Sequence, residues 1–217
     1  MSAREESMLK VYSCTVGPIY TNCYIVADKK TGECIIIDPG YDENRIAGVV
    51  NQQGFKPVAI FITHGHFDHI QASNEIRARY GIKIYAPEGD KKYLTNANYN
   101  MSYDFLRERY EVNADVYLKD DEIIEMLGQK IKCIETPGHT PGGMCFYFEA
   151  ENLLFAGDTL FYQSHGRTDF IGGSERDLIA SIKNKLFILP DNTIVYPGHD
   201  SETSIGFEKK FNIVNMY

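Results

Sequence analysis

The chain has no tryptophan, no Cys-x-x-C pair and no apolar run that approaches the length of a membrane span. Its longest apolar runs, Cys34–Ile37 and Val58–Ile62, fall far short of the ~20 residues that a spanning helix needs. Basic residues are also in deficit, because 22 Lys and Arg face 30 Asp and Glu and leave a formal net charge of −8. Broad nucleic-acid binding requires a basic surface, so the sequence predicts neither a nucleic-acid partner nor a membrane.

Signals for secretion and for two common enzyme classes are missing as well. The N-terminal segment, Met1–Ser7, contains no apolar stretch of the kind found in a signal peptide. No G-x-S-x-G motif is present, which argues against a serine nucleophile, and no G-x-G-x-x-G follows an expected strand, which argues against a dinucleotide cofactor. The five cysteines are odd in number, and four lie in or beside apolar runs. We therefore expect buried, reduced thiols in a cytoplasmic protein.

No Pro/Ser-rich or low-complexity linker divides the chain, so we expect one domain over residues 1–217. Apolar and β-branched runs predict strands over Leu9–Cys14, Asn22–Ala27, Glu33–Ile37, Val58–Thr63, Ile82–Tyr85, Val116–Leu118, Glu122–Leu127, Lys130–Glu135, Met144–Phe148, Leu153–Phe155 and Thr193–Tyr196. Helices are expected over Asp42–Gln53, Asp68–Tyr80, Ser174–Leu186 and a short tail from Ser204, whereas residues 87–110 are weakly patterned. Helices at both ends of a run of strands predict a layered α/β fold with two sheets.

A histidine-rich segment follows directly after the strand expected at Val58–Thr63. His64, His66, Asp68 and His69 fall within six residues. The first two can point toward one centre, and the last two begin a helix and can point toward a second. Imidazole and carboxylate are good ligands for zinc, iron and manganese. A solvated turn would explain a single histidine but not four ligand-type side chains behind an apolar strand.

Three more ligand-type residues each follow an expected strand: His139, Asp158 and His199. A glycine precedes each of them, and glycine lets the chain approach an ion closely. Each Gly-His or Gly-Asp pair alone is typical of an ordinary turn. Together with the histidine-rich segment, however, the three indicate a metal centre.

This constellation resembles the metallo-β-lactamase superfamily, and within it the short single-domain relatives of hydroxyacylglutathione hydrolase (glyoxalase II). The superfamily's His-x-His-x-Asp-His motif matches residues 64–69. Four further stretches carry the resemblance to these hydrolases: residues 137–142, 155–161, 166–169 and 196–199. The resemblance runs from about Val11 to Glu208 and implies a four-layer αββα sandwich, with the metals at one edge between the two sheets.

The resemblance also implies how the ligands divide between two divalent ions, for which we expect zinc, with iron and manganese as alternatives. The ligands of the first ion would be His64, His66 and His139, those of the second Asp68, His69 and His199, and the bridge between them Asp158. Asp68 would also orient the nucleophile and is the expected catalytic residue. Asp38 matches a position near the site that does not ligate.

Three residues of the segment after Asp158 are predicted to line the substrate pocket: Tyr162, His165 and Arg167. Tyr99 and Tyr103 fit either the pocket or simple packing. Because two divalent ions would change the formal charge from −8 to −4, the site would be locally positive and suit a small anionic substrate.

The implied reaction is hydrolysis of a small thioester, glyoxalase II-like, by a hydroxide shared between the two ions. One alternative on the same scaffold is a persulfide dioxygenase with a single iron held by His64, His139 and Asp158; another is a lactone or ester hydrolase. A non-catalytic binding protein would be expected to have lost a ligand, and all seven are present. The longer hydroxyacylglutathione hydrolases have a C-terminal region with cationic contacts to glutathione. This chain ends at Tyr217, so we expect weak discrimination for the thiol carrier.

Overall fold

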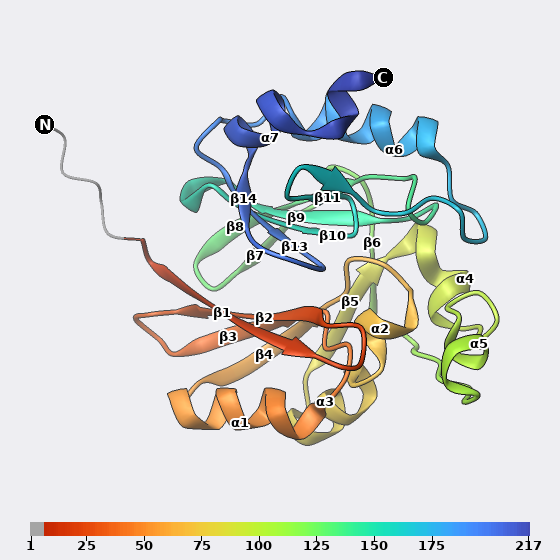
Figure 1. Ribbon diagram of the computed structural model, residues 1–217. Helices are drawn as coiled ribbons and strands as arrows, with labels where there is room; N and C mark the ends of the chain where they lie inside the picture. The colour runs from red at the N-terminus through yellow and green to blue at the C-terminus, as the bar shows by residue number, and fades with distance from the viewer. Residues whose placement is uncertain (1–6) are drawn as a thin grey trace, which may run out of the picture.

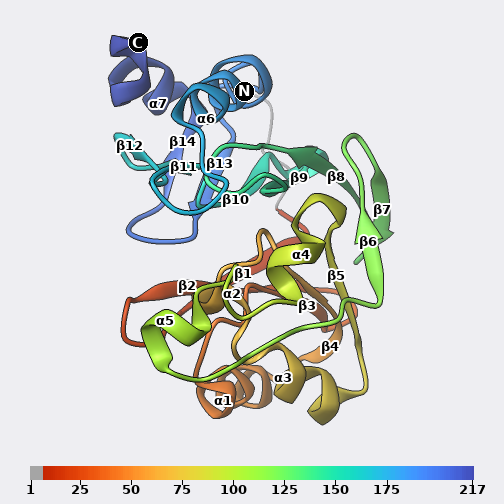
Figure 2. The same cartoon turned by 90° about the vertical axis from the view of Figure 1, so that its right-hand side faces the viewer.

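Two six-stranded sheets face each other, and helices cover the outer face of each, so that the chain forms four layers (Figure 1, Figure 2). The computed structural model describes residues 7–217. Residues 1–6 make up most of the N-terminal segment in which we expect no signal peptide, and they lie outside the described residues. The predicted four-layer αββα sandwich is confirmed as the fold of this single domain.

The strands and helices follow the expected order along the chain. The first sheet contains, in spatial order, β1 (Leu9–Val16), β2 (Thr21–Asp28), β3 (Glu33–Ile37), β4 (Lys56–Phe61), β5 (Lys83–Pro87) and β6 (Val116–Leu118). The second contains β14 (Thr203–Ser204), β13 (Ile194–Pro197), β10 (Leu153–Gly157), β9 (Met144–Phe148), β8 (Gln129–Glu135) and β7 (Ile123–Met126). A small ribbon pairs β11 (Leu160–Phe161) with β12 (Ser164–His165).

The longer helices lie outside the sheets. The α-helices are α1 (Glu43–Gln53), α2 (Phe67–Ile70), α3 (Ser73–Tyr80), α4 (Lys91–Leu94), α5 (Ser102–Leu106), α6 (Glu175–Ser181) and α7 (Ile205–Phe211). Short helical turns are η1 (Glu88–Asp90), η2 (Glu149–Glu151), the π-helical η3 (Ile182–Leu186) and η4 (Ile213–Met216). Figure 1 shows α1 and α3 beneath the first sheet and α6 and α7 above the second. Among residues 7–217, no helix is both long and apolar enough to cross a membrane.

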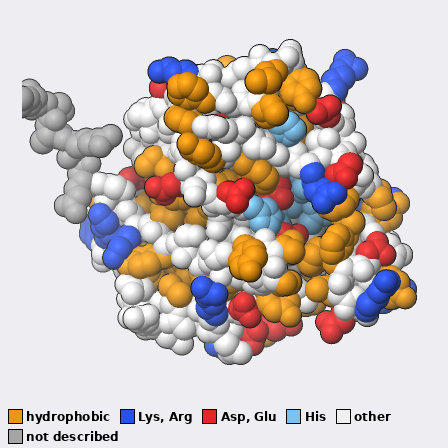
Figure 3. Space-filling model, viewed as in Figure 1, with side chains coloured by type: hydrophobic (Ala, Val, Ile, Leu, Met, Phe, Trp, Pro, Cys, Tyr) orange, Lys and Arg blue, Asp and Glu red, His pale blue; other side chains and the backbone are white. Residues whose placement is uncertain are grey.

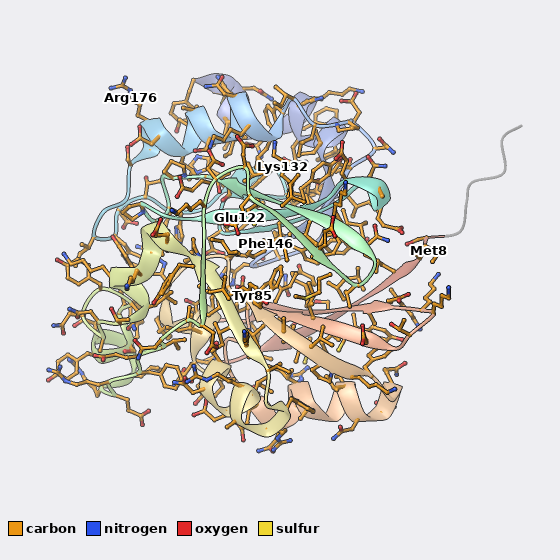
Figure 4. The ribbon with its side chains drawn as sticks, turned by 180° about the vertical axis from the view of Figure 1, so that it is seen from behind. Met8, Tyr85, Glu122, Lys132, Phe146 and Arg176 are labelled. Carbon is orange, nitrogen blue, oxygen red and sulfur yellow. The ribbon has the colours of Figure 1, made fainter. Side chains whose placement is uncertain are left out.

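The central strands are apolar on both faces because each sheet is covered on both sides. In β3, Ile35 and Ile37 face the second sheet, whereas Ile36 packs against the helices α1 and α3. Between the sheets, the ring of Phe61 lies 4.9 Å from that of Phe146 and 5.2 Å from that of Tyr85. Figure 4, seen from behind, shows the labelled Tyr85 and Phe146 in the region between the two sheets. This continuous core fixes the two sheets against each other.

The helix expected over Asp68–Tyr80 is wrong, because the structure contains two helices there with a break between them. The N–H of Ala72 donates to the carbonyl of Pro39 at 2.8 Å, in the turn after β3. This contact leaves α2 as a single turn that carries Asp68 and His69. The break therefore separates the ligand-bearing turn from the packing helix α3. All five cysteines are buried and unpaired, as expected.

Several strands end at the same edge of the sandwich, where the segments after β3, β4, β8, β10 and β13 converge. The carboxyl ends of strands are where open α/β sheets commonly place their ligands. In this chain, the two sheets contribute loops to one edge from both sides. That edge holds the ligand-type residues singled out from the sequence.

Candidate metal centre

The structure brings the seven predicted ligands together at this edge. The turn after β4 supplies the histidine-rich segment, and α2 continues from it. The segments after β8, β10 and β13 supply, in that order, His139, Asp158 and His199. Ligands from both sheets thus meet across the top of the central core.

Two groups of side chains have the spacing of metal ligands. The first ligand group is His64, His66 and His139, and the second ligand group is Asp68, His69 and His199. Within each group, one ligand atom per residue lies within 4.8 Å of the others. His64, His69 and Asp158 form a third set of the same kind, which overlaps both groups.

Asp158 lies between the two ligand groups. Its Oδ2 is 3.4 Å from Nε2 of His139 in the first group and 3.6 Å from Nε2 of His199 in the second. Its Oδ1 is 3.3 Å from Nε2 of His69. One carboxylate therefore reaches both groups, which is the position that a bridging ligand needs.

Four potential metal-ligating atoms show that these residues are suited to bind divalent cations. Nε2 of His64, His66 and His69 and Oδ1 of Asp158 are buried without a hydrogen-bond partner. Buried polar atoms are nearly always paired, since leaving one unpaired costs about 1–3 kcal/mol. These nitrogen and carboxylate oxygen atoms converge on a shared space. Zinc or iron ions bound there would be partners for all of them.

Two histidines of the first ligand group, His64 and His66, are held neutral. Burial lowers the pKa of His64 well below its ordinary value, and neighbouring His69 adds to this effect. Burial likewise lowers the pKa of His66 to about 3. Metal binding requires a neutral imidazole with a free lone pair. These two ligands are therefore ready to bind a cation at neutral pH.

The second ligand group concentrates negative charge. Burial alone would raise the pKa of Asp68, but His69 and His199 hold it well below its usual range. Burial alone would lower the pKa of His69, but Asp68, Asp158 and Asp38 together raise it well above its ordinary value. Three carboxylates around one imidazole attract either a proton or a metal cation.

Asp38 orients His69 without reaching the centre itself. Its Oδ2 lies 2.9 Å from Nδ1 of His69 and accepts a hydrogen bond from the Thr63 hydroxyl at 2.6 Å. Its Oδ1 accepts the Thr63 N–H at 2.7 Å. The backbone of Asp38 adopts φ +50°, an unusual conformation for a residue other than glycine. Such carboxylate partners fix the ring orientation of a ligating histidine.

Asp90 plays a comparable part on the other side of the centre, and the sequence patterns did not indicate it. It is fully buried in η1. Its Oδ2 accepts hydrogen bonds from the Gly65 N–H and the Thr140 hydroxyl, and its Oδ1 accepts one from the Gly142 N–H, all at 2.8 Å. Asp90 therefore ties the turn of the histidine-rich segment to the loop that follows β8. Its only signal in the sequence was an acidic residue soon after an expected strand.

Close backbone approach explains the glycine before His199. A Cβ on Gly198 would collide with Oδ1 of Asp158 and would lie 2.7 Å from Cε1 of His69. A glycine is therefore needed for the segment after β13 to close over the other ligands.

The ring of His139 is oriented by a backbone contact, because its Nδ1 lies 2.7 Å from the carbonyl oxygen of Arg167.

A cavity of about 470 Å³ opens above the ligands. Figure 3 shows histidine atoms at the bottom of a hollow between the two halves of the molecule, bordered by hydrophobic side chains. His165 and Arg167, two of the predicted substrate residues, line this cavity. The third, Tyr162, instead stacks on Phe207 of α7, with ring centroids 5.1 Å apart.

Tyr99 and Tyr103 also lie apart from the residues that line the cavity. The hydroxyl of Tyr99 accepts a hydrogen bond from the Lys92 ammonium at 2.6 Å. The ring of Tyr103 carries the Arg109 guanidinium at 5.5 Å from its centroid. Both tyrosines therefore make local contacts in the 87–110 segment.

Comparisons with known proteins agree with this geometry. Residues 16–199 match the family described as the metallo-beta-lactamase superfamily. YqgX, a probable metallo-hydrolase of Bacillus subtilis, is 37% identical over 199 residues, covering 91% of this chain and 93% of the relative. GloC, a hydroxyacylglutathione hydrolase of Haemophilus influenzae, is 32% identical over 198 residues, covering 88% of this chain and 91% of the relative.

Solved structures share the fold over nearly the whole chain. BLEG-1, a B3 metallo-beta-lactamase, aligns with a TM-score of 0.89 at 36% identity, covering 95% of this chain and 98% of that chain. TTHA1623, solved in a di-iron-bound form, aligns with a TM-score of 0.82 at 29% identity, covering 94% of this chain and 99% of that chain. The four layers seen here are therefore shared with metal-binding relatives.

Proposed function

The chain belongs to the metallo-β-lactamase superfamily, and from that premise we propose that it is a metal-dependent hydrolase of small thioesters. A relative at 32% identity is named as a hydroxyacylglutathione hydrolase, which supports a hydroxyacyl thioester as the substrate. The products would then be a hydroxy acid and a free thiol. The five buried, unpaired cysteines support a reducing, cytoplasmic setting for this reaction.

We assign one divalent ion to the first ligand group and one to the second, with Asp158 between them. Two such ions would polarise a carbonyl oxygen and would lower the pKa of a bound water toward ~7. Zinc suits histidine and carboxylate donors in hydrolases. Iron remains the alternative, because the related TTHA1623 was solved with two iron atoms.

Asp68 is the residue we assign to orienting the attacking water. It lines the cavity, and its Oδ2 accepts the Thr21 hydroxyl at 2.9 Å and lies 3.2 Å from Nε2 of His199. The pKa of Asp68 is held well below its usual range by His69 and His199, against the effect of burial, so the side chain is an ionised acceptor. An ionised carboxylate orients a water by accepting its hydrogen bond.

The leaving group needs little help from the protein. A free thiol has a pKa near ~8.5, so a thiolate departs without a strong general acid. No lysine or arginine among the described cavity residues is placed to protonate it, since Arg167 is already bound to Asp169. This suits a thioester better than an amide, whose amine must be protonated as it leaves.

The observation that carries the proposal is the set of buried, unpaired donor atoms beneath an accessible cavity. His66, Asp68, His139, Asp158 and His199 all contribute to both the ligand set and the cavity lining. A structural metal site is closed by its protein ligands, whereas a catalytic one keeps an open side. The open side here faces the cavity where a substrate carbonyl would enter.

A second candidate is a persulfide dioxygenase that holds one iron with His64, His139 and Asp158. Two histidines and one carboxylate form the usual ligand set of oxygen-using non-haem iron enzymes. TTHA1623 shows that a related site binds iron, although it holds two iron atoms and this candidate uses one. A lactone or ester hydrolase is a third reading, which differs only in the leaving group.

Parallel assays separate these candidates. Protein loaded with zinc or iron is given lactoyl thioesters while thiol release is followed, and a persulfide while dissolved oxygen is followed. We expect thiol release that depends on added metal, with no oxygen uptake. Oxygen consumption with a persulfide, and no thioester hydrolysis, would instead support the dioxygenase.

A further inference from the structure

The rim of the cavity is apolar. Six hydrophobic side chains from separate segments surround the opening: Ile19, Phe67, Met101, Phe105, Phe161 and Phe170. They come from the β1–β2 turn, α2, the residue before α5, α5 itself, β11 and the loop before α6. The metal ligands at the base are polar, so the cavity has a polar floor and hydrophobic walls.

Two of these side chains expose more apolar surface than folding alone would favour. Phe105 is 54% exposed and Ile19 is 43% exposed. Single exposed hydrophobic residues are ordinary, but large ones gathered around a cavity indicate a contact surface. Because both lie at the opening, a bound ligand would remove them from water.

An aromatic row leads from this rim to the ligands. Phe105 stacks on Phe67, with ring centroids 5.2 Å apart and an interplanar angle of 20°. Phe170 meets Phe105 edge to face at 6.3 Å and meets the His66 ring in the same way at 5.7 Å. One wall of the cavity is therefore a continuous aromatic surface from the solvent to the first ligand group.

The positive charge of Arg167, the arginine in this wall, is already neutralised by a carboxylate. Arg167 donates from Nε and Nη2 to the two carboxylate oxygens of Asp169, each at 2.7 Å. Its guanidinium lies 3.8 Å from the centroid of the Phe170 ring. A ligand carboxylate would have to displace Asp169 to reach it. Lys209, in α7, is bound to Asp191 and to the carbonyl of Leu189, away from the lining of the cavity.

We propose that the rim selects thioesters whose thiol part is uncharged and apolar, of about the size of one aromatic ring, with Phe105 and Ile19 as specificity-determining residues. This inference rests on the proposed thioester hydrolysis and narrows its substrate class. It replaces the anionic substrate and the weak discrimination for the thiol carrier that the sequence alone predicts. The ions that the two ligand groups would hold bind the carbonyl end of the thioester, and the aromatic row contacts its thiol end. An anionic carrier such as glutathione finds no uncompensated cation among the described residues of the rim.

A matched pair of substrates tests the preference. Lactoyl thioesters of benzyl thiol and of glutathione share the acyl group and differ in the charge and shape of the thiol part. We expect kcat/KM to be at least about tenfold higher for the benzyl thioester. Since the rim contacts act on binding, Phe105→Ala should raise KM for this substrate about tenfold and leave kcat within about twofold.

Two further variants make the effect specific. Phe211→Ala is the control, because Phe211 is 59% exposed on α7 outside the cavity lining, and we expect unchanged kinetics. Asp169→Asn frees Arg167, and we expect it to improve kcat/KM for the glutathione thioester several-fold without improving the benzyl thioester. Phe105→Leu should restore most of the affinity lost in Phe105→Ala.

A binding measurement keeps this inference distinct from the proposed function. The thioether in which a CH2 group replaces the carbonyl of the lactoyl benzyl thioester, 1-(benzylsulfanyl)propan-2-ol, cannot be hydrolysed. It is titrated calorimetrically into metal-loaded protein and into the Phe105→Ala variant, which should bind it about tenfold more weakly. Binding of this kind without hydrolysis of any thioester would defeat the proposed function and leave the apolar site standing. A preference for the glutathione thioester, with no effect of Phe105→Ala, would overturn the inference and leave thioester hydrolysis standing.

Discussion

The two ligand groups differ in how deeply they are buried. In the first, His64 is 2% exposed and His66 and His139 are each 4% exposed. In the second, His69 is fully buried, but the side chains of Asp68 and His199 are 11% and 21% exposed. Both groups contribute to the cavity lining, but the first is the more enclosed by protein and the second opens further toward the cavity.

The supporting contacts differ in the same direction. Asp90 joins two ligand loops around the first group through three hydrogen bonds from buried partners. In the second group, Asp38 fixes His69, while Asp68 has the Thr21 hydroxyl as its protein donor. The enclosed group should therefore hold its ion tightly. The open group should exchange its ion more readily and lie nearer to an incoming substrate.

The largest effect is expected at the carboxylate that serves both groups. Asp158→Ala removes the side chain that contacts His69, His139 and His199, so both ions should be lost and activity should fall to the background rate. Asp38→Ala removes an orienting contact only, and such contacts usually cost ~10–100-fold in metal affinity or activity. Metal content and thioester hydrolysis, measured side by side, check this order. Equal losses of activity with full metal content in both variants would show that the two aspartates have been assigned wrongly.

A smaller and one-sided effect is expected at Asp90. Asp90→Asn turns one acceptor into a donor that faces the N–H or hydroxyl groups of the ligand loops. We expect the first group to lose metal affinity by ~10–100-fold, with a smaller loss in the second. Metal titrations with a competing chelator measure the affinity of each of the two ligand groups.

Asp191→Asn is the matched control for that experiment, because Asp191 forms an exposed ion pair with Lys209 on the surface. Its metal titration should be indistinguishable from that of the unaltered protein. A loss of both ions together in Asp90→Asn, with normal folding, would mean that Asp90 does not act on one group selectively.

The smallest effect is a difference in pH dependence. Burial keeps the pKa of His66 at about 3, so the first group releases no proton from His66 when it binds a cation near neutral pH. The carboxylates around His69 outweigh burial and raise its pKa well above the ordinary value, so a cation must displace a proton there. Affinity in the second group should therefore increase with pH, by roughly tenfold per unit for one displaced proton. Zinc titrations between about pH 6 and pH 8 should show that the affinity of the weaker site rises steeply with pH, whereas that of the tighter site changes less. Equal pH dependence of the two affinities would contradict this difference between the groups.

The two-sheet α/β fold and the ligand-type residues could be anticipated from the sequence because they depend on local signals, whereas the four-layer order and the division of the ligands were implied by the family resemblance. Apolar runs such as those of β3 and β4 fix buried strands, and ligand-type residues directly after strands meet at one edge. The break between α2 and α3 could not be anticipated, because it depends on the Ala72 contact with the carbonyl of Pro39, more than thirty residues away.

The supporting and substrate residues were harder to predict, for a related reason. Asp90 is distinguished by its partners, which come from distant loops, and not by its neighbours in sequence. Tyr162 lies in the right segment, but its ring turns to stack on Phe207. Phe105 belongs to a weakly patterned segment, and only the fold places it at the cavity. Contacts between loops therefore set the parts of the site that local patterns do not reveal.

Elemental analysis during stepwise removal of metal tests the contrast between the two groups most directly. Protein reconstituted with zinc and freed of excess metal should contain two equivalents per chain. A chelator should remove one equivalent first, with loss of thioester hydrolysis, while the second equivalent remains bound in the enclosed group. A single tightly held equivalent, with no second site filled even when metal is added, would contradict the two-ion centre.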